Sequence, residues 1–105
     1  MSFGVVAMTF SIVCLSPTLR CGADPDTLTD NLRRIETAWH AVGAPSTRVV
    51  LLPSGCLTGG AGFATQAAAS AAVAPLRAWA NGAEVCIGGA ERIDGRLQGF
   101  IVAPH

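Results

Sequence analysis

The sequence predicts an α/β fold: a single layered domain with the element order β-α-β-α-β-β. Short apolar runs rich in β-branched residues alternate with two segments of helical character, and the last two runs flank a tight turn. The 105 residues are half apolar and only 13% are charged, which is typical of one small packed domain. Within the domain at 1–105, we expect residues 1–9 to be a leader and residues 10–104 to be the folded region.

The first strand is predicted at 10–16, where the sequence reads FSIVCLS. A helix follows, with Asp24 as its N-cap, Pro25 at its first position and Gly43 as its end. Helical spacing divides its residues into two faces. The predicted inward face is Leu28, Leu32, Ile35, Trp39 and Val42, and the predicted outward face is Arg33, Glu36, Thr37 and His40.

The second strand is predicted at 47–53, and a glycine-rich loop at 54–63 follows it. Its apolar residues are continuous and do not alternate with polar ones, which is typical of a parallel strand with both faces covered. The alanine-rich segment after the loop has helical propensity, but Pro75 predicts a kink or two short helices, with Leu76 and Trp79 facing inward. A third strand at 83–91 then leads to a hairpin whose turn is Asp94-Gly95.

Composition excludes several classes of function. The net charge is zero and every cation is Arg, so nothing favours binding to nucleic acid or to an anionic membrane. The apolar N-terminal stretch lacks the basic start of a signal peptide and is too short to span a bilayer. No two cysteines are spaced as CxxC, and both histidines are remote from them, so we expect no metal, no cofactor and reduced thiols in the cytoplasm. These residues are Cys14, Cys21, Cys56, Cys86, His40 and His105.

Three segments, in order, resemble the N-terminal part of a carbon–nitrogen hydrolase, a member of the nitrilase and amidase superfamily. FSIVCLSPTLRCGADPDTLTDNLRRI is similar to that family's first strand, loop and helix. RVVLLPSGCLTGG is similar to its second strand and the following loop, and VCIGGAERIDGRLQGFIVAP to its next strand and hairpin. The resemblance implies half of an αββα sandwich. Family members bury one side of this layer against a second half and then against another subunit.

The resemblance also implies a reaction, the hydrolysis of non-peptide amides or nitriles by a Cys nucleophile, a Glu base and a Lys. This chain departs from that pattern. Ser54 occupies the position of the general-base Glu, Gly60 replaces the usual Tyr, and the sequence contains no Lys. A thiol requires a base within hydrogen-bond reach, so we expect no catalytic residue in this chain.

Other constellations in the sequence are weaker. The loop at 54–63 is a possible small-ligand site through Ser54, Cys56, Thr58 and Gly59. Cys56 with His40 or His105 would be a Cys–His pair, but nothing in the sequence brings them together. Glu84 and Glu91 are expected to be surface carboxylates at loops or strand ends.

The favoured function is therefore a non-catalytic, truncated nitrilase-like domain that acts as a structural or interaction subunit. With half of the sandwich missing, apolar surface should be exposed, and we expect a homo-oligomer or a protein partner that covers the sheet. One alternative is a fragment of an amide or nitrile hydrolase that another chain completes. The other is a small-ligand-binding module that uses the 54–63 loop.

Overall fold

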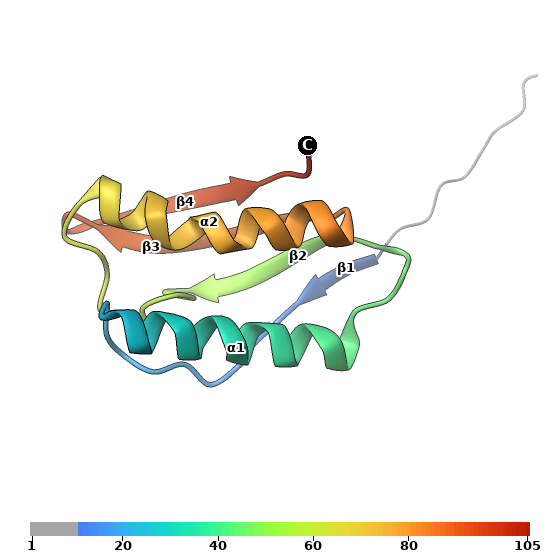
Figure 1. Cartoon of the computed structure of the whole chain (residues 1–105), viewed down its shortest axis with the longest axis horizontal. Coiled ribbons are helices and arrows are strands. Elements are labelled where there is room, and N and C mark those ends of the chain that lie inside the picture. The colour runs from blue at the N-terminus through green and yellow to red at the C-terminus, as the bar shows by residue number, and fades with distance from the viewer. Residues whose placement is uncertain (1–10) are drawn as a thin grey trace, which may run out of the picture.

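The computed structural model describes residues 11–105, and the predicted leader at 1–9 lies outside the described residues. The predicted order β-α-β-α-β-β is confirmed (Figure 1). Each element lies within a few residues of its predicted place. The elements are β1 (Ser11–Cys14), α1 (Pro25–Val42), β2 (Thr47–Ser54), α2 (Gln66–Ala83), β3 (Cys86–Ile93) and β4 (Arg96–Val102).

The four strands form one sheet in the order β1-β2-β3-β4. β1, β2 and β3 are parallel, and β4 returns antiparallel to β3. Two successive right-handed crossovers that advance in one direction across a sheet place their helices on the same face. Accordingly, α1 and α2 lie side by side over one face of the sheet (Figure 1).

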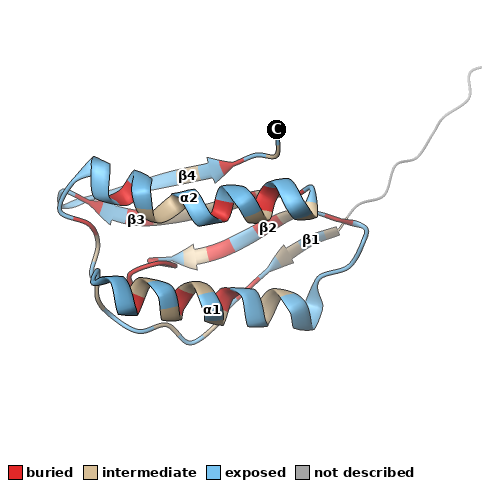
Figure 2. Cartoon of the chain, in the orientation of Figure 1, coloured by how far each residue is buried: buried red, intermediate tan, exposed pale blue. Residues whose placement is uncertain are grey.

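The core lies between the two helices and the sheet (Figure 2). Ile35 of α1, Leu76 of α2, Val50 of β2 and Ile87 of β3 are each at most 1% exposed. Among residues 11–105, no helix or strand covers the other face of the sheet. The prediction that both faces of the second strand are covered is therefore wrong for these described residues, since Leu51 is 43% exposed. A continuous apolar run shows that both faces tolerate burial, but not what covers them.

Helix α1 begins as predicted. The side chain of Asp24 accepts a hydrogen bond from the N–H of Thr27 at 3.1 Å, and Pro25 occupies the first turn. A hydrogen bond from the Thr27 hydroxyl, followed by this backbone bond, lowers the pKa of Asp24. Ile35 is buried as predicted, and Leu28, Leu32 and Trp39 pack against the core. Val42 is 55% exposed, contrary to prediction, because it lies on the last turn, where the helix no longer packs against the core.

Helix α2 is one continuous helix from Gln66 to Ala83, so the prediction of two short helices is wrong. Pro75 lies inside it and cannot donate a backbone hydrogen bond to Ala71. Both residues are exposed, so water can bind the free carbonyl on the solvent side of the helix. The inward orientation of Leu76 and Trp79 is confirmed.

The hairpin between β3 and β4 turns at Asp94 and Gly95, as predicted. Both residues have positive φ, 49° and 75°, which is the geometry of the two-residue turn that such a pair favours. β3 begins at Cys86, three residues later than predicted, because α2 continues to Ala83 and Glu84 caps it in the left-handed conformation. Glu84 is exposed, as expected.

Candidate functional site

The loop after β2, at 55–62, is anchored by a buried carboxylate. Glu91 of β3 is 1% exposed. Its Oε1 accepts hydrogen bonds from the N–H groups of Leu57, at 2.7 Å, and Thr58, at 3.0 Å, and its Oε2 accepts one from the Thr58 hydroxyl, at 2.8 Å. The prediction of a surface carboxylate at Glu91 is therefore wrong. Three donors from the loop replace the water that a surface carboxylate would bind.

A buried amide anchors the same loop from the opposite side. Asn31 of α1 is fully buried, and its Nδ2 donates to the carbonyl oxygens of Leu57, at 2.7 Å, and Arg20, at 2.9 Å. Its Oδ1 accepts from the N–H of Arg20 at 2.8 Å. Asn31 thus joins the loop after β1 to the loop after β2. We predicted no such role for Asn31 from the sequence, although its position four residues before Ile35 places it on the inward face.

The two loops also meet through their backbones. The N–H of Gly22 donates to the carbonyl of Thr58 at 2.9 Å. Gly59 lies so close to the other loop that an added Cβ would be 2.2 Å from the carbonyl oxygen of Arg20, and its φ is 63°. Only glycine fits there without moving the backbone. We predicted Gly59 to be part of a ligand site. In the structure it packs against the loop after β1.

The predicted site residues separate into two groups. Cys56 and Thr58 are fully buried beside Glu91, whereas Ser54 and Gly59 are exposed. The Thr58 oxygen also accepts from the N–H of Gly62 at 2.8 Å, so its hydrogen-bonding capacity is used inside the loop. Burial, followed by the negative charge of Glu91, raises the pKa of the Cys56 thiol from 9.0 to about 12. At neutral pH this thiol is protonated and has little nucleophilic character.

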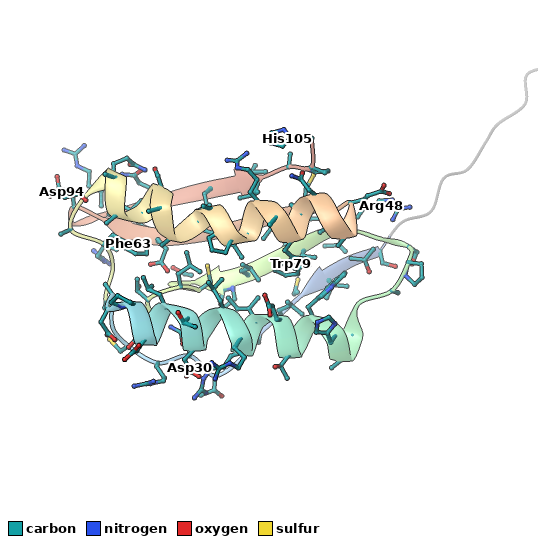
Figure 3. All side chains as sticks on the ribbon, in the orientation of Figure 1. Asp30, Arg48, Phe63, Trp79, Asp94 and His105 are labelled. Atoms are coloured by element: carbon teal, nitrogen blue, oxygen red, sulfur yellow. The ribbon has the colours of Figure 1, made fainter. Side chains whose placement is uncertain are left out.

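The histidines lie at the other end of the sheet from Cys56. His40 is on the last turn of α1, which leads into the amino end of β2, and Cys56 follows the carboxyl end of β2. The eight residues of β2 span about 26 Å. The N–H of His105 donates to the side chain of Asn81 near the end of α2, and Figure 3 shows His105 far from Phe63, which closes the loop. The structure brings neither histidine to Cys56.

A cavity of about 230 Å³ lies between α2 and the β3–β4 hairpin. Its lining includes Phe63, Ser70, Arg77, Gln98 and Phe100. Ligand pockets commonly have volumes of about 300 to 1,000 Å³. This space is below that range, so it gives little support to a small-ligand site.

The sheet surface opposite the helices is a second candidate site, which we call the open face. Strand alternation and register place its residues on one side. Its largest side chains are well exposed, at 81% for Ile101, 62% for Leu97, 58% for Ile12 and 43% for Leu51. The predicted exposure of apolar surface is thus confirmed. Within residues 11–105, the open face consists of Ile12, Cys14, Val49, Leu51, Cys86, Gly88, Ala90, Arg92, Leu97, Gly99 and Ile101.

All four cysteines are free thiols; Cys56 is buried, Cys86 is partly buried, and Cys14 and Cys21 are exposed. Within residues 11–105, no three metal-ligating side chains cluster where they could hold an ion. Over the same residues, neither helix combines the length and apolar character needed to cross a bilayer. The chain matches no family model, no curated protein and no solved structure.

Proposed function

We propose that this chain is a non-catalytic interaction domain that binds a protein partner through its open face. The observation that carries the proposal is the exposure of Ile101, Leu97, Ile12 and Leu51 on one continuous sheet surface. Scattered apolar residues are normal on protein surfaces, but a contiguous apolar patch indicates an interaction site. Within the part of the chain that the structure describes, the two helices cover only the opposite face, which leaves this one accessible to a partner.

The loop after β2 supports a non-catalytic role. The position that the family resemblance assigns to a general base is Ser54, which has no useful basicity. The nearest thiol, Cys56, has a pKa of about 12. The nearest buried carboxylate, Glu91, already accepts three hydrogen bonds from the loop. We therefore assign these groups to holding the loop in place.

The test uses two thiols already present in the chain. Cys14 lies on the open face and Cys21 lies in the loop after β1, and both are exposed. The chain is produced in its native host, and the lysate is treated with a maleimide and compared with the purified chain at high dilution. We expect Cys14 to react more slowly in the lysate, because the partner covers it, while Cys21 reacts equally in both. Equal rates for Cys14 would contradict the proposal.

A pair of substitutions links this protection to the open face. Ile101→Glu places a charge at the most exposed apolar position of the face. Val42→Glu places the same charge on α1, where Val42 is 55% exposed and lies outside the open face. We expect the first substitution to abolish protection of Cys14 in the lysate and the second to leave it unchanged. The free thiols are compatible with a cytoplasmic location, which we include in the proposal.

A second candidate function is a subunit of a carbon–nitrogen hydrolase that another chain completes. The observation that favours it is the exposure of Ser54 at the carboxyl end of a parallel strand, on a loop fixed by Glu91 and Asn31. Such strand ends are common places for catalytic side chains. Ser54→Glu in the purified complex should raise hydrolysis of a panel of amides and nitriles, whereas Ser54→Gln should not. No gain with glutamate would remove this candidate.

A further inference from the structure

We infer that the partner on the open face is a second copy of this chain, packed sheet against sheet about a two-fold axis. The inference rests on the proposed function and names its partner. It starts from the relief of the open face, which is uneven in a regular way. One register row across the four strands consists of Cys14, Leu51, Gly88 and Ile101.

Large and small side chains alternate on this row. Leu51 and Ile101 stand on either side of Gly88, and the Leu51 Cδ2 atom is 3.2 Å from the point that a Cβ on Gly88 would occupy. The next row pairs Ala90 with Gly99, which are also small. A shallow hollow therefore runs over β3 and β4, between the two large side chains, and both of these contribute to its lining.

A surface that carries both protruding apolar side chains and an apolar hollow can bind a second copy of the same surface. A two-fold axis places the same patch on both sides, so that Ile101 of each copy enters the hollow over Gly88 and Gly99 of the other. Two sheets packed face to face lie about 10 Å apart, a distance that interdigitating leucine and isoleucine side chains fill.

Charge also favours a second copy over a partner recruited by charge complementarity. Apart from Arg92, the residues of the open face are uncharged. Arg92, opposite Leu97 in the register, brings a charge only to its far end. The whole chain has zero net charge, so two copies do not repel each other at long range. Binding to a partner of opposite charge would instead favour a charged face.

The size of the face sets the strength of the association. The strands contain 4, 8, 8 and 7 residues. Standard strand rise and spacing then give a flat footprint of about 430 Å² per copy, or about 860 Å² for both. Side-chain relief increases the accessible area that is buried. This total is below the roughly 1,200 Å² of stable interfaces and lies in the range of weak, transient ones, so the structure favours a weak, reversible dimer.

The experiment follows the thiols of the purified full chain as its concentration rises from about 1 to about 200 µM, across the range where such a dimer assembles. Maleimide reaction rates are measured separately for Cys14 and Cys21 by peptide mass spectrometry. We expect the Cys14 rate to fall at least about threefold, as the bound fraction grows, while the Cys21 rate stays constant. Sedimentation equilibrium over the same range should change from monomer to dimer mass.

Substitutions then locate the interface. Ile101→Glu should make the Cys14 rate independent of concentration and keep the chain monomeric, and Val42→Glu should behave as wild type. Because the wild-type measurement stands by itself, the result does not depend on whether the Ile101 variant folds. A Cys14 rate that is constant with concentration, together with monomer mass throughout, would overturn the inference.

The same thiols separate the two proposals. If Cys14 is protected in the lysate but not by concentration of the purified chain, another protein covers the open face, and only the second-copy inference fails. If Cys14 is unprotected in both experiments, the proposed function fails as well. If a dimer forms but Cys14 remains as reactive as in the monomer, the copies meet elsewhere and the inference is overturned.

Discussion

Replacing Glu91 with glutamine tests whether the buried carboxylate holds the loop after β2. The substitution preserves the size of the side chain and removes its charge. The amide oxygen can still accept from the N–H groups of Leu57 and Thr58, which now donate to Oε1 at 2.7 and 3.0 Å. The amide nitrogen, however, would face the Thr58 hydroxyl, which at present donates to Oε2 at 2.8 Å. Two hydrogen bonds therefore lose their charged acceptor, and the third reverses, with the amide nitrogen donating to the Thr58 oxygen.

The magnitude follows from these three bonds. A hydrogen bond to a charged group contributes about 1.5 to 3 kcal/mol, and a neutral one about 0.5 to 1.5 kcal/mol. Replacing three charge-assisted bonds with neutral ones removes about 1 kcal/mol each and should lower the free energy of unfolding by about 3 kcal/mol in total. A urea slope of about 1.5 kcal/mol/M is reasonable for a chain of this size, so the unfolding midpoint should move down by about 2 M.

The assay is urea unfolding, followed by tryptophan fluorescence and far-UV circular dichroism at low protein concentration. Glu84→Gln is the matched control, because Glu84 is exposed, and its substitution should change stability by less than about 0.5 kcal/mol. If Glu91→Gln and Glu84→Gln unfold at the same midpoint, the carboxylate does not hold the loop and our account of this region is wrong.

Three further predictions concern single residues. Cys56 should resist maleimide at pH 8 while the exposed Cys21 reacts, because the pKa of Cys56 is raised from 9.0 to about 12. The contribution of the protonated Cys56 thiol to stability is therefore complete below pH 9 and is lost as the pH rises toward 12. Urea unfolding in alkaline buffers measures this loss. Asn31→Ala should cost about 3 kcal/mol in urea unfolding because it leaves buried loop groups unpaired, whereas the exposed Asn81→Ala should not. Pro75→Ala should raise the free energy of unfolding by about 3 kcal/mol, since it restores a helix hydrogen bond.

The parts of the fold that depend on neighbouring residues could be predicted from the sequence. Asp24 and Pro25 fix the start of α1 because a cap and a first-turn proline act within one turn of the helix. Asp94 and Gly95 fix the hairpin because the required positive φ angles belong to those two residues. Pro75 was misleading, because α2 is held, despite the missing hydrogen bond, by residues such as Leu76 and Trp79 that pack against the core.

The candidate site depends on contacts between residues that are distant in sequence. Asn31 and Leu57 are 26 positions apart, and Glu91 and Leu57 are 34 apart. A polar residue in a sequence carries no mark of such a partner, so Glu91 was predicted at the surface. Leu51, which is 43% exposed, shows a different limit. Its apolar character indicates that it can be buried, but the sequence pattern does not identify the surface that would cover it.

Ser54 has a consequence for how this chain can vary. It is exposed at the end of β2, while the residues that follow it are held by Glu91, Asn31 and the Gly59 contact. The free energy that fixes the loop therefore comes from residues other than Ser54. Position 54 is tolerant: serine, glutamine or glutamate there should fold equally well. Single substitutions at position 54 could therefore add or remove an acidic group at this strand end without a detectable change in stability.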